Sequence, residues 1–231
     1  MELKFDKKPL IALPVSDKSF ENIQLSALKG KVDLLEFRVD QFEDRDLDFI
    51  KNLGKKVREK NFGIILTIRL KEEGGADIPD EQRFSMFRYL IEIADIVDIE
   101  LNSKINKKVI DLAKDNGKYA LVSYHDFEKT PSKEEIQKII DKGKDLKADI
   151  IKYAFKVNTI DDVGRILSIT YQNQDKLLVA IGMGDLGKIT RVAGFFFGSK
   201  ITYTYTGKSF APGQIELNTL IEELKFYGLN I

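Results

Sequence analysis

The chain has 231 residues, of which 43% are hydrophobic and 32% charged, a composition typical of globular rather than disordered proteins. Its 37 basic residues are scattered and balanced by 37 acidic ones, which argues against a nucleic-acid-binding surface. No apolar run approaches the roughly 20 residues that cross a bilayer, and the absence of cysteine excludes disulfides and thiolate metal sites. We therefore expect a cytoplasmic protein that binds neither nucleic acid nor a membrane.

Short apolar runs rich in β-branched residues recur along the whole chain, and each has the length of a buried strand. In chain order they cover residues 10–15, 34–39, 64–70, 97–101, 119–125, 149–155, 177–183 and 201–205. The spacing between successive runs leaves room for one helix and two loops.

The segments between these runs have the features of amphipathic helices. In residues 131–147, Ser132 with Glu135 three positions later forms a capping box, followed by isoleucines at helical spacing. Residues 79–94 open with proline and acidic side chains, as a first helical turn prefers. Residues 214–228 end on a glycine, a common helix stop.

Eight strand–helix units in succession predict parallel strands joined by crossover helices, and hence a closed (β/α)8 TIM barrel forming a single domain over residues 1–231. The same alternation of strands and helices would also fit an open doubly wound sheet, which is the alternative. Only nine residues precede the first strand, so any cap on the barrel floor must be small. We interpret the phenylalanine run 195–197 as packing of a helix on the core.

Polar side chains interrupt the apolar strands mainly in their later halves, and in a barrel of this kind the carboxyl ends of the strands build the site. Charges in such strands are costly unless paired, so an ion-pair network that only stabilises the barrel mouth is one reading. The polar strand residues are Glu36, Arg38, Asp40, Thr67, Arg69, Asp98, Glu100, His125 and Lys152, and Met183 ends the seventh strand.

His125 is the only histidine, and it ends the fifth strand, whereas Lys152 interrupts the sixth. Neighbouring strands would bring the two side chains to the same rim. A lysine attacks a ketone in its unprotonated form, which burial and nearby arginines favour. The resulting iminium acidifies the adjacent C–H, and an imidazole can remove that proton and deliver it to a leaving hydroxyl. The pair is thus suited to eliminating water beside a carbonyl.

Three loops add candidate binding residues. Glu73 lies in residues 69–75, on a loop that two glycines would make flexible or that is a simple turn. Residues 182–191 lack dinucleotide and Walker spacing, and Arg191 there suits a carboxylate. Residues 209–214 form either a proline–glycine turn or a lid whose Gln214 reaches a substrate.

The ordered set of these motifs resembles type I 3-dehydroquinate dehydratase, the Schiff-base dehydratase of the shikimate pathway, over nearly the whole chain. The motifs that carry the resemblance are EFRVD at 36–40, TIRLKEEGG at 67–75, SYHDFEKTP at 123–131, IIKYA at 150–154, GMGDLGKITR at 182–191 and APGQI at 211–215. The resemblance implies a (β/α)8 barrel, a homodimer, and no metal or organic cofactor. It implies 3-dehydroquinate as the small-molecule substrate and a syn elimination to 3-dehydroshikimate and water.

The same resemblance implies a role for each candidate residue. Lys152 would form the iminium with the C3 ketone, His125 would be the base at C2 and the acid at the C1 hydroxyl, and Glu73 would orient His125. Arg191 would clamp the substrate carboxylate. The ring hydroxyls and carbonyl would be positioned by Glu36, Arg38, Arg69 and Gln214, with Met183 against the ring.

One departure from the family pattern lies in the lid. Many members carry a serine immediately before APGQ, whereas this chain has Phe210 there and Ser209 one position earlier, so neither is assigned a role. Two other functions remain open from the residues alone: a class I aldolase or transaldolase with a strand lysine, and a non-catalytic barrel that binds a metabolite.

Overall fold

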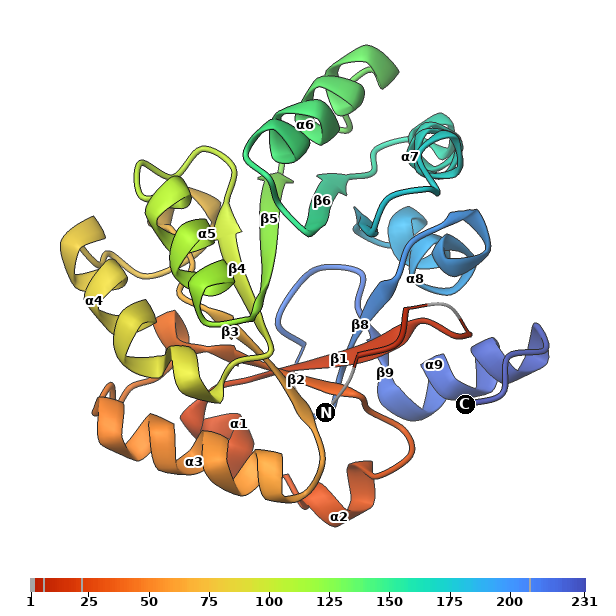
Figure 1. Cartoon of the computed structure of the whole chain (residues 1–231). Coiled ribbons are helices and arrows are strands. Elements are labelled where there is room, and N and C mark those ends of the chain that lie inside the picture. The colour runs from red at the N-terminus through yellow and green to blue at the C-terminus, as the bar shows by residue number, and fades with distance from the viewer. Residues whose placement is uncertain (1–2, 6, 22, 208) are drawn as a thin grey trace.

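A computed structural model describes residues 3–5, 7–21, 23–207 and 209–231. Eight parallel strands curl into a TIM-barrel-like sheet surrounded by helices (Figure 1). The strands are β1 (Leu10–Val15), β2 (Leu34–Arg38), β3 (Gly63–Thr67), β4 (Ile96–Glu100), β5 (Tyr119–Asp126), β6 (Ile150–Lys156), β7 (Leu178–Met183) and β8 (Ile201–Tyr205). The short β9 (Ile215–Glu216) pairs in parallel with the end of β8. Each predicted run forms a strand, which confirms the barrel.

The strands follow one another around the sheet in the order β7-β6-β5-β4-β3-β2-β1-β8-β9. Strands β7 and β8 are joined by an isolated parallel bridge between Leu178 and Ser199 in place of a continuous ladder. Next to this bridge, Lys200 N donates a 2.7 Å hydrogen bond to Leu178 O. This bridge is where the curled sheet meets itself.

The helices connect successive strands and cover the outside of the sheet (Figure 1). Ser132 caps α6 with the predicted capping box, in which Glu135 returns the hydrogen bond. The longer helices are α3 (Leu47–Glu59), α4 (Asp80–Leu90), α5 (Asn106–Asp115), α6 (Lys133–Asp145), α7 (Ile160–Gln172) and α9 (Leu217–Phe226), and the short ones are α1 (Asp17–Glu21), α2 (Leu25–Leu28) and α8 (Ile189–Ala193). Among the described residues, no helix is long and apolar enough to cross a membrane.

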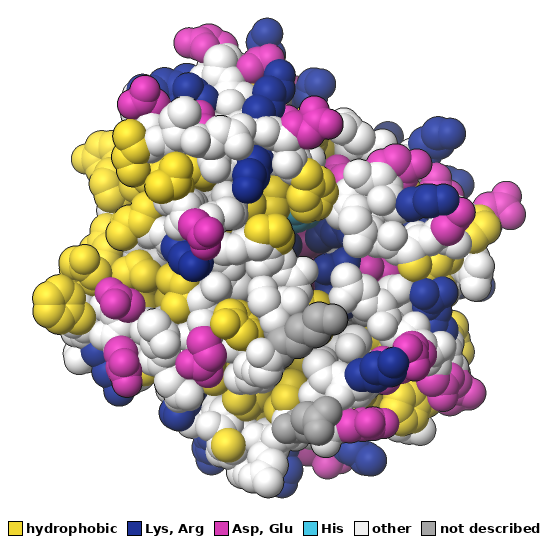
Figure 2. Space-filling model, turned by 180° about the vertical axis from the view of Figure 1, so that it is seen from behind, with side chains coloured by type: hydrophobic (Ala, Val, Ile, Leu, Met, Phe, Trp, Pro, Cys, Tyr) yellow, Lys and Arg dark blue, Asp and Glu magenta, His cyan; other side chains and the backbone are white. Residues whose placement is uncertain are grey.

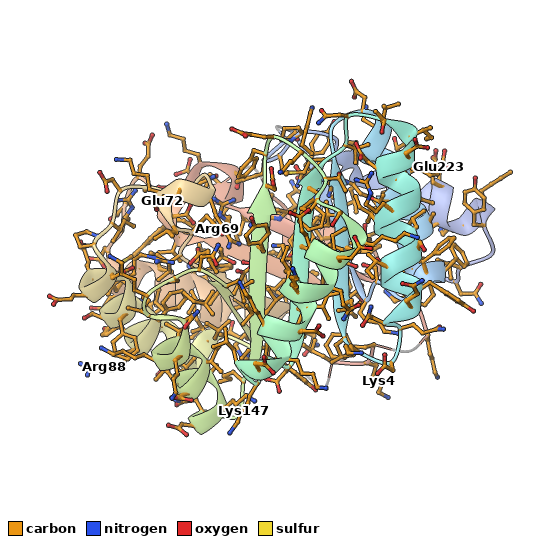
Figure 3. The ribbon with its side chains drawn as sticks, turned by 90° about the horizontal axis from the view of Figure 1, so that it is seen from above. Lys4, Arg69, Glu72, Arg88, Lys147 and Glu223 are labelled. Carbon is orange, nitrogen blue, oxygen red and sulfur yellow. The ribbon has the colours of Figure 1, made fainter. Side chains whose placement is uncertain are left out.

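The two ends of the barrel differ in character. Seen from behind Figure 1, the molecule has a central hollow in which the cyan of the only histidine shows beside basic side chains (Figure 2). In side view, Arg69 and Glu72 lie toward the end at which the strand arrows point, and Lys147 lies at the opposite end (Figure 3). At that opposite end, Leu3 is buried with the inward-facing side chains and Phe5 packs edge-on against Tyr119, forming the small cap expected there.

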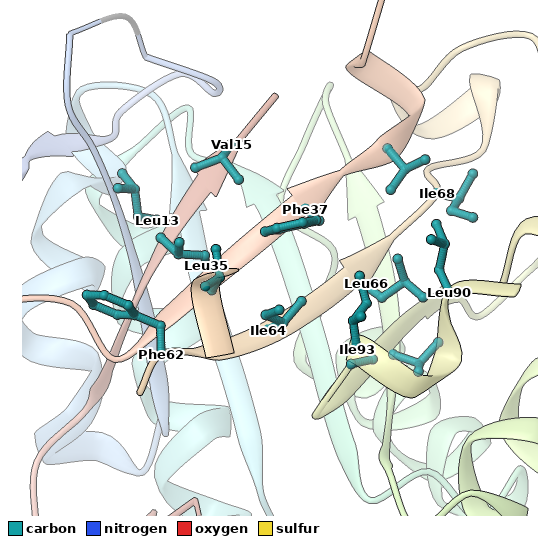
Figure 4. Close-up of a cluster of buried hydrophobic side chains, with 14 of the residues drawn as sticks. Leu13, Val15, Leu35, Phe37, Phe62, Ile64, Leu66, Ile68, Leu90 and Ile93 are labelled. Atoms are coloured by element: carbon teal, nitrogen blue, oxygen red, sulfur yellow. The ribbon is translucent and has the colours of Figure 1, made fainter. Parts of the chain in front are cut away.

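Strand residues alternate between the barrel interior and apolar clusters beneath the helices, as the period of two requires, and the outward residues of β6 and β7 pack in a cluster of their own. One core fills the space between the sheet and its helices, where Leu35 and Phe37 of β2 lie near Ile64 and Leu66 of β3 (Figure 4). The barrel interior forms a separate core. Its lowest layer is Leu10, Leu34, Ile65, Ile96, Leu121, Ile150, Val179 and Ile201.

The phenylalanine run after α8 does not pack as predicted. Phe196 and Phe197 are 48% and 36% exposed in a short 3-10 turn, η5 (Gly194–Phe197). Phe196 meets Tyr227 edge-on, and Phe197 meets Tyr171 in the same way. The interpretation of this run as core packing was wrong for Phe196 and Phe197, because the 3-10 turn leaves their rings at the surface, where Tyr227 also contacts Phe226.

Candidate active site

A cavity of about 140 Å³ opens at the carboxyl ends of the strands. All nine residues that the sequence singles out line it: Glu36, Arg38, Arg69, Glu73, His125, Lys152, Met183, Arg191 and Gln214. The barrel therefore brings together residues from strands and loops that are far apart in the chain.

Lys152 lies in the middle of β6, where its inward position follows from Ile150 two residues earlier. Its Nζ donates to Asp98 Oδ2 at 3.1 Å and to Tyr203 Oη at 3.2 Å, and lies 3.7 Å from Glu36 Oε1. The charged partners of the amine are thus carboxylates, and Arg69, one of the arginines expected near it, donates to the same Asp98 oxygen.

Asp98 and Arg69 form the base of the site beneath the amine. Arg69 Nη2 donates to the same Asp98 oxygen at 2.9 Å, and its Nη1 donates to Ser123 Oγ at 2.6 Å. Ser123 in turn donates to the other oxygen of Asp98 at 2.7 Å. Both Arg69 and Lys152 hold the pKa of the buried Asp98 carboxyl well below its usual range, although burial alone would raise it.

His125 lies two residues beyond Ser123 on the same face of β5, and Ser123 pairs with Lys152 in the neighbouring strand. Its Nδ1 lies 2.7 Å from Glu73 Oε2, and its ring stacks on Phe127. The other ring nitrogen, Nε2, is therefore the one available to a bound molecule.

Burial penalises charge on both members of this pair. It lowers the pKa of His125 well below the usual value, assisted by Arg69 and Lys152, and it raises the pKa of Glu73 to about 8. Near neutral pH the two side chains therefore share one exchangeable proton. Without that proton the pair is a base, and with it the pair is an acid.

The turn that carries Glu73 is tight, not flexible as one reading of its two glycines suggested. Glu73 ends a 3-10 turn, η2 (Lys71–Glu73), and Gly74 follows it with φ of 84°. A Cβ on Gly75 would come within 1.9 Å of the Arg69 carbonyl oxygen, so only glycine fits. Glu100 supports the same turn by accepting from Leu70 N at 2.7 Å.

Arg191 is a buried cation of a different kind. Its guanidinium donates to backbone carbonyls, most closely to Gly213 O at 2.7 Å, and among the described residues it has no carboxylate partner. Burial lowers its pKa to about 10. By contrast, Arg38 is held by a bidentate ion pair with Asp40. A buried guanidinium that lines a cavity without an acidic partner is suited to an anionic ligand.

Residues 210–212 and Gln214, which precede β9, form part of the cavity wall. Gln214 Oε1 accepts from Phe210 N at 2.8 Å and from Ser209 Oγ at 3.0 Å, so this side chain shapes the loop as well as lining the cavity. Phe210 itself lines the cavity, whereas Ser209 does not.

Two residues that contact the amine were not among the sequence candidates. Asp98 was considered only as part of an ion-pair network, and Tyr203 was not singled out. The alternation ITYTY does place Tyr203 on the same face as the inward-pointing Ile201, which is the signal that could have found it.

Comparison with known proteins agrees with this geometry. Residues 10–231 match the family model of type I 3-dehydroquinase. The 3-dehydroquinate dehydratases of Hydrogenobaculum sp. (strain Y04AAS1) and Aquifex aeolicus (strain VF5) are each 41% identical to this chain over 95% of its length, and cover 99% and 100% of their own.

Solved structures give the same relationship. The crystal structure of the Aquifex aeolicus enzyme has a TM-score of 0.85 over 95% of this chain and 99% of that chain, at 40% identity. A type I enzyme from Clostridium difficile, solved with covalently modified comenic acid, has a TM-score of 0.87 at 26% identity over 96% of this chain and 94% of that chain. The chain therefore belongs to the type I 3-dehydroquinase family.

Proposed function

We propose that the protein is a 3-dehydroquinate dehydratase, a hydro-lyase of the shikimate pathway, that works through an iminium on Lys152. The observation that carries this proposal is that Lys152 and His125 line one cavity together with Arg191. The relatives above, named for this activity, support the substrate, and the comenic acid complex of one of them is in keeping with covalent chemistry in this fold.

The substrate would enter with its carboxylate toward Arg191, a cavity cation that has no acidic partner among the residues that the structure describes. This orientation would direct the C3 ketone to the Lys152 amine. Met183 packs against the ring, and Glu36, Arg38, Arg69 and Gln214 position the hydroxyls and carbonyl. No metal or organic cofactor takes part in this scheme.

The chemical steps follow from the pair of residues. The Lys152 amine attacks C3, and loss of water gives an iminium that acidifies the C2 proton. His125, held at Nδ1 by Glu73, removes that proton through Nε2 in its base form. The enamine then expels the C1 hydroxyl, which takes the proton back from His125, and hydrolysis of the iminium releases 3-dehydroshikimate and the amine. The elimination is syn because one group handles both the proton and the hydroxyl.

We further propose that the protein is a cytoplasmic homodimer. The exposed aromatic side chains Phe196, Tyr227 and Phe226, which contact one another in sequence, are in keeping with a protein partner.

The experiment adds 3-dehydroquinate and follows the absorbance of the conjugated enone product in wild type and in His125→Ala. We expect product from the wild type, and severely reduced turnover from His125→Ala, in which Lys152 still slowly binds the ligand covalently. Wild-type turnover in His125→Ala would refute its role. Failure of the wild type to form the enone, with cleavage of a phosphorylated sugar instead, would favour an aldolase. If the protein converts neither 3-dehydroquinate nor a phosphorylated sugar, the result would favour a non-catalytic barrel.

A further inference from the structure

We propose that Tyr203 is a further catalytic residue of this site, and that its phenol hydroxyl relays protons between the Lys152 amine and the substrate's carbonyl oxygen. The inference deepens the proposed function and rests on the iminium at Lys152.

The contact between the two side chains has two parts. Lys152 Nζ donates to Tyr203 Oη at 3.2 Å, and Nζ also lies 4.4 Å from the centre of the Tyr203 ring. Lys152 is on β6 and Tyr203 on β8, so the two meet across the barrel interior, with β7 between them in the sheet. Both line the cavity, which places the hydroxyl beside the atom that attacks the ketone.

The Tyr203 hydroxyl has a proton to give. Among the described residues, Oη has no hydrogen-bond partner other than Lys152, for which it is the acceptor. Burial raises the pKa of this phenol well above its usual value, and Glu36 and Asp98 raise it further, so the group remains a neutral hydroxyl at physiological pH. It can therefore accept from nitrogen and donate to a bound oxygen at the same time.

The carboxylates and the other hydroxyls near the amine cannot do both. The Asp98 carboxylate accepts from Arg69, Ser123 and Lys152 and has no proton to donate. The hydroxyls of Thr67 and Ser123 already donate, to Glu36 and to Asp98 respectively. Tyr203 is thus the hydroxyl near the amine that retains a free proton within the described part of the chain.

Formation of the iminium has a proton balance that such a relay satisfies. Starting from the ammonium, nitrogen carries three protons, the iminium retains one, and the water that leaves carries the other two with the carbonyl oxygen. Tyr203 first takes a proton from nitrogen and gives its own proton to the carbonyl oxygen, which leaves a lone pair on nitrogen. That lone pair then bonds to C3, and the carbonyl π pair moves to oxygen. A second relay protonates the hydroxyl as the C–O bond breaks and the nitrogen lone pair forms C=N. Tyr203 ends as it began, and no other reactant is needed.

The test compares Tyr203→Phe with Tyr153→Phe. Phenylalanine keeps the ring over the amine and removes only the hydroxyl. Tyr153 follows Lys152 in β6, but its hydroxyl is bonded to Thr170 on the helix side of the sheet, so Tyr153→Phe removes a buried phenol hydroxyl outside the site. Each enzyme is mixed with 3-dehydroquinate, quenched with borohydride at successive times, and the mass gain of the Lys152 peptide is measured.

We expect iminium formation to slow by about 10²-fold in Tyr203→Phe, the scale of one lost proton-transfer group, and by less than about threefold in Tyr153→Phe. Incorporating 3-fluorotyrosine at position 203, which retains the hydroxyl, should restore the rate to within about tenfold of wild type. A wild-type trapping rate in a folded Tyr203→Phe would overturn the role of Tyr203 alone. If Tyr203→Phe does not fold, a pH dependence of trapping identical to that of the wild type in the fluorotyrosine enzyme, whose phenol is more acidic, would overturn it. A wild-type enzyme that gains no mass at Lys152 would instead overturn the proposed function.

Discussion

The lower and upper layers of the barrel interior are built from the same strands, two residues apart, yet have opposite character. Leu34, Ile65 and Ile96 lie in an apolar layer that is fully excluded from solvent. The next inward residues of the same strands are Glu36, Thr67 and Asp98, which are equally buried but bonded to one another or to Lys152. The lower layer supplies stability by excluding water, whereas the upper layer holds charges that are stabilised only by their partners.

Lys152→Met should have the largest effect, because it should abolish turnover in the upper layer without disturbing the lower layer. The methionine fills a similar volume without the amine, so the lower layer is untouched, and turnover should fall by about 10⁴-fold or more because the nucleophile is gone. Enone absorbance measures turnover, and circular dichroism verifies the fold. Residual turnover within about tenfold of wild type would contradict the role of Lys152.

Leu121→Ala should have the converse effect. Leu121 is 0% exposed in the lower layer, so the cavity left by the shorter side chain should lower the free energy of unfolding by about 2–5 kcal/mol. Denaturant unfolding measures this loss. The kcat of the folded enzyme should stay within about threefold of wild type, and a far larger loss of kcat would show that the two layers are not separable.

The amino-acid sequence alone predicts some of these features and not others. The strands and the inward position of Lys152 follow from a period of two, which is local information. Contact between Lys152 and Tyr203 depends on how the sheet curls and closes, which no local pattern contains. Likewise, the tight fit of Gly75 against Arg69 and the outward turn of Phe196 depend on neighbouring backbone.

Arg191→Met allows two arginines of the cavity, Arg191 and Arg69, to be compared. Because Arg191 has no carboxylate partner in the described part of the chain, its removal leaves no buried acid unpaired. We expect kcat/KM to drop by about 10²-fold, mainly through KM, since a charged hydrogen bond to the substrate is lost. The melting temperature should fall less than in Arg69→Met, which leaves the buried Asp98 and Glu100 without their cation. A KM unchanged from wild type would remove Arg191 from substrate binding.

Glu73→Gln should lower the maximal rate by about tenfold, with a larger change in pH dependence. In the wild type, the pair of Glu73 and His125 keeps its shared proton until the pH reaches the raised pKa of Glu73, about 8. Because the pair acts as a base only after losing this proton, kcat/KM should rise with pH and level off above that value. Without the carboxyl, titration of His125 alone remains, and burial lowers its pKa below the usual value. The rise should therefore move to a pH below about 6.5. A profile that stays in place in Glu73→Gln would show that Glu73 does not hold the shared proton.

The most direct measurement is peptide mapping of the wild-type enzyme after borohydride reduction in the presence of 3-dehydroquinate. The account predicts one modified site, the peptide that contains Lys152, with a mass gain equal to the reduced adduct, and no gain when substrate is omitted. Modification of any other lysine, or none while the enone still forms, would contradict it.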